Sequence, residues 1–322
     1  MKKKNIYIAY LAIVFALSYL WQFVIFRTGG VQSSLFSFLM WIPGILAIVF
    51  ILTKKESLRK VGWDLKKWSY IFPAIFIPLT IAISIVLLME ALHWATFAGK
   101  LFTFKNGMVE ISNIKLILGN QSQNIPFFIL NFLLSHTIFL VVGSIITLGE
   151  ELGWRGYLQE KIVRKFGLNQ GLIFLGIIWG YWHLPIILMG FNFPNHPVLG
   201  ALLLMPLGTI FLGIFMGWLY LRSRSIWVPA LAHASANLFS QLIFSFVIMH
   251  QDELFRQLTW IAAWGIVAIL CLINLNRNKP VFWQETNETT HNKSLNLTEN
   301  AGDTINQNLH LIRKGLYHSQ LR

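Results

Sequence analysis

Long runs of apolar residues, almost free of charge, alternate along the chain with short polar connections. A helix needs about 20 apolar residues to cross a bilayer, and several runs reach or approach that length. Backbone polar groups find no water in lipid, so such runs must be helical, and the alternation of a membrane barrel is absent. We therefore predict an all-α, polytopic bundle of about eight transmembrane helices, at about residues 6–26, 35–52, 71–93, 126–148, 168–189, 198–221, 226–249 and 257–275.

The composition favours a membrane protein and excludes several other classes. Apolar and aromatic residues make up 55% of the 322 residues and charged residues only 12%, about half the share of charge in soluble domains. So few charges could not cover a soluble fold of this size, and a disordered chain or a nucleic-acid-binding arm is equally excluded. The single cysteine, Cys271, excludes a disulfide framework and any zinc site built from cysteines.

Positive charges gather near both ends of the chain and in the second, fourth and sixth predicted connections. Lysine and arginine number 26, against 13 aspartate and glutamate residues. The positive-inside rule therefore places both termini and the even connections in the cytoplasm of a multi-pass cell-membrane protein. We expect the lipid bilayer as a partner and no nucleic acid, and the sequence leaves the oligomeric state open.

The last part of the chain differs from the apolar part in composition. Residues 276–322 are rich in asparagine, with scattered charge and few aromatic residues, which is typical of a mobile polar extension. No internal repeat divides the apolar part. We predict one membrane domain over residues 1–275 and a polar cytoplasmic tail over residues 276–322.

The first cluster of charges at membrane depth is the segment EELGWR at residues 150–155, directly after the run 126–148. An ionisable group in a membrane span costs about 2.5–3.5 kcal/mol on insertion scales, so each one suggests a function. Glu151 and Arg155 are four residues apart on one helix face and can pair, whereas Glu150 lies about 100° around the helix. The paired carboxylate would stay ionised, and its neighbour would be free to accept a proton. The alternative is an interfacial helix end with a surface ion pair.

Two further clusters place histidines within apolar runs. His183 stands in the segment WGYWHLP, where Pro185 frees a backbone carbonyl one turn earlier and favours local irregularity. His233 and Asn237 are four residues apart and share a helix face, with small residues between them. A histidine and an amide on one face can donate two hydrogen bonds to a developing oxyanion. Each group alone is also compatible with packing or with a polar clasp between helices.

Taken together, the glutamates, histidines and amide are the groups needed to activate water and to stabilise a tetrahedral intermediate. No acyl nucleophile accompanies them. Ser235 lies about 200° around the helix from His233, and Cys271 has no base near it in sequence. Water, activated by glutamate or by a metal ion, is the expected nucleophile.

The positions of these residues along their predicted spans restrict the path of the helix that carries His183. Its ring would lie about 22 Å along the predicted span, whereas Glu150 and His233 lie near span ends. The three can meet only if the helix at 168–189 starts shallow, tilts or breaks near Gly180. We predict that they line a funnel-shaped polar cavity open to the cytoplasm.

The three clusters resemble, in order and spacing, the motifs of the CPBP family of intramembrane metalloproteases, also called the Abi or type II CAAX prenyl endopeptidase family. The family pattern is EExxxR, then an aromatic residue followed by xxxH, then HxxxN. It matches within residues 126–250, with Trp179 in place of the usual phenylalanine. The resemblance implies a membrane metalloendopeptidase, a hydrolase whose substrate is a peptide or a membrane protein. It also suggests a role in bacteriocin immunity or in peptide and protein maturation.

The resemblance implies a role for each matching residue of this chain. Glu150 resembles the residue that activates water, and Glu151 with Arg155 resembles its supporting pair. His233 and Asn237 resemble the groups on the oxyanion side.

A divalent metal, with zinc as the expected ion, is also implied. His183 resembles a histidine that assists water activation or binds metal. Glu150, His183 and His233 could form a three-ligand zinc site, with Glu151 as the base. Alternatively, the metal binds only His183 and His233, and Glu150 is the base. We prefer the second arrangement, because a glutamate that ligates a metal cannot also be a free base.

Two other classes of function compete with an endopeptidase. The first is a non-catalytic membrane scaffold or immunity protein that retains the protease fold. The second is a small transporter, which ranks last because the paired halves of many transporters are absent and the polar groups cluster in one region.

Overall fold

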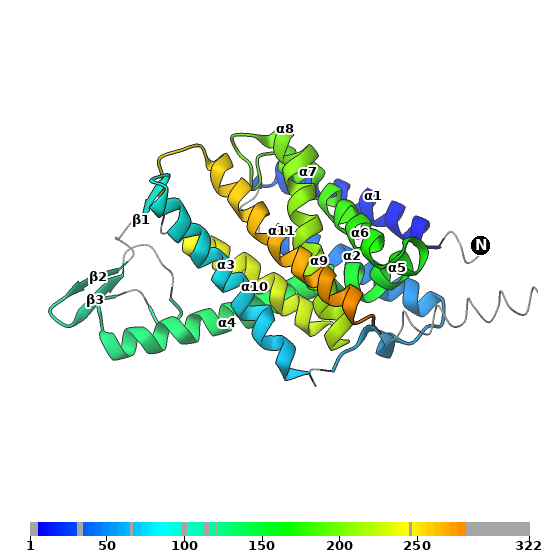
Figure 1. Cartoon of the computed structure of the whole chain (residues 1–322), viewed down its shortest axis with the longest axis horizontal. Helices are drawn as coiled ribbons and strands as arrows, with labels where there is room; N and C mark the ends of the chain where they lie inside the picture. The colour runs from blue at the N-terminus through cyan, green and yellow to red at the C-terminus, as the bar shows by residue number, and fades with distance from the viewer. Residues whose placement is uncertain are drawn as a thin grey trace, which may run out of the picture. The chain divides into compact units, whose positions relative to one another are not determined.

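The computed structural model describes residues 6–30, 35–64, 67–97, 102–111, 116–119, 121–244 and 247–280. Helices dominate the described chain (Figure 1), which confirms the predicted all-α class. Contacts divide the chain into two units, Met1–Asn274 and Leu275–Arg322. The predicted tail at 276–322 lies almost entirely outside the described residues, so its placement stays a prediction.

Six of the predicted spans are matched by long apolar helices in the described residues. They contain α1 (Ile6–Arg27), α2 (Phe36–Thr53), α3 (Ile71–Ala91), α4 (Ile125–Glu151), α9 (Met205–Ser223) and α11 (Glu253–Arg277).

The other two predicted spans differ from single long helices. The segment predicted at 168–189 is divided into α6 (Leu168–Trp182) and α7 (Leu184–Leu188). The segment predicted at 226–249 consists of α10 (Trp227–Phe244) and the short strand β5 (Val247–Met249), separated by two residues outside the described part.

The predicted continuation of the helix at 126–148 through the acidic cluster is confirmed. α4 passes directly into a π-helix, Leu152–Gln159, and then into α5 (Glu160–Phe166). The sequence pattern did not predict the π-helix, a form often found at functional sites. Neighbouring glycines let α2 approach closely, because a Cβ at Gly149 would lie 2.6 Å from the Met40 carbonyl oxygen.

Short strands, which the sequence pattern did not predict, lie in the connections between helices. β1 (Ala95–Phe97) pairs antiparallel with β5. β2 (Phe102–Lys105), β3 (Met108–Ile111) and β4 (Gln123–Asn124) form an antiparallel sheet before α4. The remaining short elements are the 3₁₀ helices Leu58–Val61 and Trp68–Tyr70, α8 (Pro197–Leu199) and the π-helical turn Gly200–Leu204 before α9.

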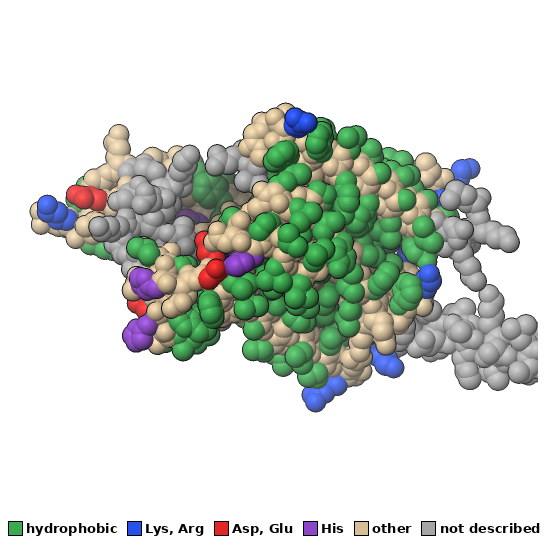
Figure 2. Space-filling view, turned by 90° about the horizontal axis from the view of Figure 1, so that it is seen from above, with side chains coloured by type: hydrophobic (Ala, Val, Ile, Leu, Met, Phe, Trp, Pro, Cys, Tyr) green, Lys and Arg blue, Asp and Glu red, His purple; other side chains and the backbone are tan. Residues whose placement is uncertain are grey.

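The outward helix faces carry large apolar side chains. Phe23, Phe38, Phe76, Leu133 and Ile269 are among many that are exposed. Figure 2 shows a broad apolar surface with charged side chains mainly at its edges. Such a surface would be unstable in water but is suited to lipid, and the chain is a multi-pass membrane protein.

The connections gather at two separate ends of the bundle. Among the described residues, we call the even end the side of residues 54–64, 67–70, 160–167 and 224–226, and the odd end the side of residues 28–30, 92–97, 102–111, 116–119, 121–124, 189–196 and 247–252. At the even end, the Ile226 amide donates to the Gly62 carbonyl at 2.7 Å. At the odd end, the His250 amide donates to the Trp94 carbonyl at 2.8 Å. The alternation of ends expected from the sequence is present.

Candidate active site

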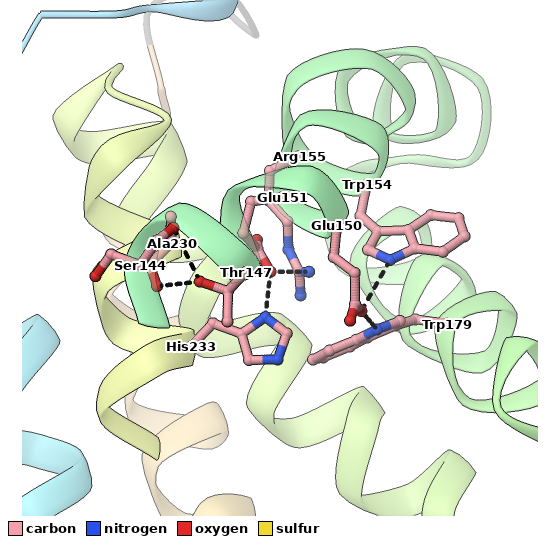
Figure 3. Close-up of polar contacts among 9 residues, drawn as sticks. All are labelled: Ser144, Thr147, Glu150, Glu151, Trp154, Arg155, Trp179, Ala230 and His233. Carbon is pink, nitrogen blue, oxygen red and sulfur yellow. Dashed lines mark hydrogen bonds and ion pairs between the residues drawn. The ribbon is translucent and has the colours of Figure 1, made fainter. Parts of the chain in front are cut away.

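The two adjacent glutamates have different partners (Figure 3). Glu151 Oε1 accepts a hydrogen bond from Arg155 Nη1 at 3.0 Å, and both side chains are fully buried. Glu150 points elsewhere, and its Oε2 accepts from Trp179 Nε1 at 2.6 Å and from Trp154 Nε1 at 3.4 Å. The predicted pair and the predicted difference between the two carboxylates are both present.

Glu151 also holds His233, which comes from α10. His233 Nδ1 lies 2.9 Å from Glu151 Oε1. An ionised carboxylate only accepts, so Nδ1 carries the proton, and Nε2 remains for other partners. α10 is fixed against α4 nearby, where Thr147 Oγ1 donates to the Ala230 carbonyl at 2.8 Å (Figure 3).

Of the three possibilities that the sequence left open for the helix with His183, a break is present. It lies at His183 itself, three residues beyond the predicted position at Gly180. Gln22 of α1 bridges the break: its Nε2 donates to the Trp182 carbonyl at 2.9 Å, and its Oε1 accepts from the Ile186 amide at 2.9 Å. Backbone groups that a break would leave unpaired are therefore satisfied within the membrane domain.

Trp179 contacts the other polar residues of the site. Its carbonyl lies 2.9 Å from His183 Nδ1, which must be protonated because a carbonyl only accepts. The Arg155 guanidinium carbon lies 4.5 Å from the centre of the Trp179 ring. The His233 ring meets the same indole edge to face at 5.3 Å. The sequence interpretation treated this residue only as an apolar ring, although its indole N–H was the signal for a polar role.

A cavity of about 370 Å³ brings together residues from all three motifs. Glu150, His183, His233 and Asn237 line it, whereas the buried Glu151–Arg155 pair does not. The other walls come mainly from apolar side chains: Phe36, Met40, Phe191, Phe193, Leu204, Met205, Leu212, Trp260 and Ile261.

The cavity opens at the odd end. Its exposed lining residues are Asn192, after α7, and Asn237 and Gln241, in the second half of α10. Arg256 and Gln257, at the start of α11, line the same part. The cytoplasmic opening expected from the sequence depends on which membrane face the odd end occupies, and it stays a prediction.

The described side chains do not form a three-ligand metal site. No group of three or more His, Cys, Asp or Glu residues in the described part is placed to hold a metal ion. The zinc arrangement of Glu150, His183 and His233 is therefore not formed. Both histidines are nevertheless oriented through Nδ1, by a carbonyl and a carboxylate, which is the usual support of metal-binding histidines.

Comparison with known proteins identifies relatives of the segment that holds this site. Residues 130–239 match the family model described as type II CAAX prenyl endopeptidase Rce1-like. Over 99 residues the chain is 31% identical to CAAX prenyl protease 2 of Methanococcus maripaludis. That alignment covers 29% of this chain and 36% of the relative, so the chain matches about a third of the relative's length.

Proposed function

We propose that this chain, which through residues 130–239 belongs to the CPBP/CAAX protease family, is an intramembrane endopeptidase that hydrolyses a peptide bond with activated water. One observation carries the proposal. A buried carboxylate, Glu150, anchored at one oxygen by two indoles, shares a cavity with two histidines and an asparagine. This is a suitable set of groups for acid–base chemistry on a peptide bond.

Glu150 is proposed as the general base. Trp179 and Trp154 hold its Oε2, which leaves Oε1 to take a proton from a water molecule in the cavity. The water oxygen attacks the scissile carbonyl carbon as that proton moves to Glu150. Glu150 then returns the proton to the leaving amine, and the C–N bond breaks.

Asn237 and His233 are proposed to stabilise the oxyanion of the tetrahedral intermediate. The Asn237 amide can donate directly from the cavity wall. His233 can donate from Nε2 only as an imidazolium, and its Nδ1 then already has the Glu151 carboxylate as partner. Arg155 compensates the charge of Glu151.

In the arrangement with a divalent metal, zinc by donor type, the Nε2 atoms of His183 and His233 would hold the ion, and Asn237 rather than His233 would then donate to the oxyanion. When bound, the ion would supply Lewis-acid polarisation of the scissile carbonyl. Metal analysis of purified wild-type protein and of His183→Ala tests this part. We expect bound zinc in the wild type and background zinc in the variant. Catalytically active wild-type protein without metal would contradict the metal site but not the role of Glu150.

The proposed substrate is a peptide or a segment of a membrane protein, cleaved at the cell membrane by an enzyme whose termini are cytoplasmic. The matched relative is a CAAX prenyl protease by name. The proposed biological role is peptide or protein maturation, or bacteriocin immunity.

A peptide library incubated with purified protein tests the proposed activity, with products identified by mass spectrometry. We expect Glu150→Gln to lower the cleavage rate by about 10²–10⁴-fold, the usual contribution of a general base. Glu160→Gln is the matched control, because Glu160 lies in α5 and pairs with Arg164 at the surface. Equal cleavage by wild type and Glu150→Gln would contradict the proposed role of Glu150, whereas no cleavage by the wild type would favour the scaffold alternative.

A further inference from the structure

We propose that substrate enters the cavity from the odd end, on the membrane face opposite the cytoplasm. The enzyme would then act on exported peptides or on extracytoplasmic segments of membrane proteins. This inference rests on the proposed protease activity and names the side from which its substrate arrives.

The first step is the orientation of the bundle, which follows from charge. In the described part, the even end carries a dense set of cations with few acids, Glu56, Asp64 and Glu160. Its cations are Lys54, Lys55, Arg59, Lys60, Lys67, Lys161, Arg164, Lys165, Arg222 and Arg224.

The odd connections hold fewer cations in the sequence, five against eleven in the even connections. Figure 2 shows the acidic and histidine side chains in view toward one end of the molecule, and most Lys and Arg in view elsewhere. The positive-inside rule therefore assigns the even end to the cytoplasm. The charged residues of the odd end that lie in the described part are Arg27, Lys105, Glu90, Glu110, Asp252, Glu253 and Arg256.

The second step is the direction of the cavity along α10. This helix begins at Trp227 at the even end, and His233 follows after six residues. Gln241, which is exposed and lines the cavity, is eight residues beyond His233. Eight helical residues correspond to about 12 Å along the axis. The cavity thus extends from the reactive groups away from the basic end.

The third step is closure on the cytoplasmic side. The segment that follows Glu150 is packed tightly: Arg155, Leu158, Gln159 and Ile162 are each at most 1% exposed. The π-helix and α5 therefore separate the reactive groups from the even end, and substrate reaches Glu150 from the odd end.

The lining chemistry matches an extended peptide of low charge. Amide side chains stand near the mouth at Asn192, Asn237, Gln241 and Gln257, with aromatic and aliphatic side chains deeper in the cavity. Amides can pair with peptide backbone groups in either direction, because each has a donor and an acceptor. Apolar walls bury the substrate side chains.

Cysteine labelling with a membrane-impermeant maleimide tests the side of access. Cys271, which is buried, is first replaced in a Cys271→Ala background. Gln241→Cys then reports the cavity mouth and Lys60→Cys the even end. In intact cells we expect labelling of Gln241→Cys and none of Lys60→Cys, with the reverse in inside-out vesicles.

Three results would overturn the inference. The first is labelling of Gln241→Cys only in inside-out vesicles, and the second is equal labelling from both sides. The third is labelling of Gln241→Cys from neither side, with full labelling after denaturation in SDS, which would show that the mouth is closed. The measurement needs no turnover and is repeated in a Glu150→Gln background. Labelling from the outer side without cleavage of any peptide would therefore contradict the proposed function but not the proposed side of access.

Discussion

At Trp179, an indole stands where the family pattern has phenylalanine, and its N–H donates to the proposed base at 2.6 Å. We expect Trp179→Phe to keep the ring and lose this bond. A hydrogen bond to a charged group contributes about 1.5–3 kcal/mol, so kcat should fall by roughly 10–100-fold with little change in KM. Steady-state kinetics on a cleaved peptide measures this effect.

Trp154→Phe is the matched control for this substitution, because Trp154 donates to the same Glu150 oxygen at the longer distance of 3.4 Å. Its effect on kcat should be smaller. A Trp179→Phe protein with wild-type kcat and wild-type unfolding temperature would show that the indole N–H does not position the base.

Residue spacing predicted some of these contacts and not others. The Glu151–Arg155 pair follows from four-residue spacing on a helix. The bonds from Trp179 to Glu150 and from His233 to Glu151 join residues 29 and 82 positions apart. Spacing within one helix carries no information about such contacts, although the motif residues themselves were found from the sequence.

At the scale of elements, the break between α6 and α7 depends on α1. Gln22→Ala removes both side-chain bonds that bridge the break. Unpaired buried backbone groups cost about 1–3 kcal/mol each, so we expect a lower unfolding temperature in detergent and a lower cleavage rate. Tyr19→Phe is the control, because Tyr19 donates to the Tyr181 carbonyl at an exposed position. Equal stability of Gln22→Ala and wild type would contradict this role.

The close approach of α2 and α4 gives a second prediction at this scale. Gly149→Ala would place a Cβ 2.6 Å from the Met40 carbonyl oxygen, which lies in a helix backbone and moves little. Overpacking typically costs about 1–3 kcal/mol. Gly143→Ala, with 3.3 Å to the Ala234 Cβ, should cost less. Thermal unfolding in detergent compares the two variants. A larger fall in unfolding temperature for Gly143→Ala than for Gly149→Ala would contradict this prediction.

Two separate arguments from the sequence indicated an irregular path for the segment at 168–189. Pro185 signals a local irregularity, and the depth of His183 required a shallow start, a tilt or a break near Gly180. The sequence did not signal the π-helix after Glu151, because apolar and polar residues there fit an ordinary α-helix equally well. Nor did it indicate that Gln22, outside the matched motifs, would support the site.

At the scale of the whole molecule, the odd end is held together by a contact that depends on pH. The Leu254 amide donates to Asp252 Oδ1 at 2.7 Å, and this bond, together with the smaller effect of His196 Nε2 at 2.9 Å, lowers the pKa of the Asp252 carboxyl. A lowered pKa stabilises the fold above the usual value of aspartate, near 4, and this stabilisation is lost as pH falls further. We expect the hydrogen-exchange protection factors of residues 192–196, which correct for the intrinsic pH dependence of exchange, to fall on acidification below about pH 4, with a smaller fall in Asp252→Asn. The same fall in both proteins would contradict this role.

The alternation of successive connections between the two ends of the bundle was predictable from the sequence, because the charge of the connections and the length of the helices determine it. The direction of the cavity was not, because it depends on which end the side chains close. Burial of Arg155 and Gln159 closes the even end, and that packing involves helices far apart in sequence.

The two adjacent glutamates are proposed to have different roles: Glu150 is the general base, and Glu151 holds Arg155 and His233 in place. The most direct measurement is the single-turnover rate of peptide cleavage by Glu150→Gln, compared with Glu151→Gln, each with its unfolding temperature. We predict that Glu150→Gln unfolds like the wild type but cleaves about 10²–10⁴-fold more slowly. Glu151→Gln should unfold earlier, since removing one partner of a buried pair costs about 3–5 kcal/mol. Wild-type cleavage by folded Glu150→Gln would contradict the account.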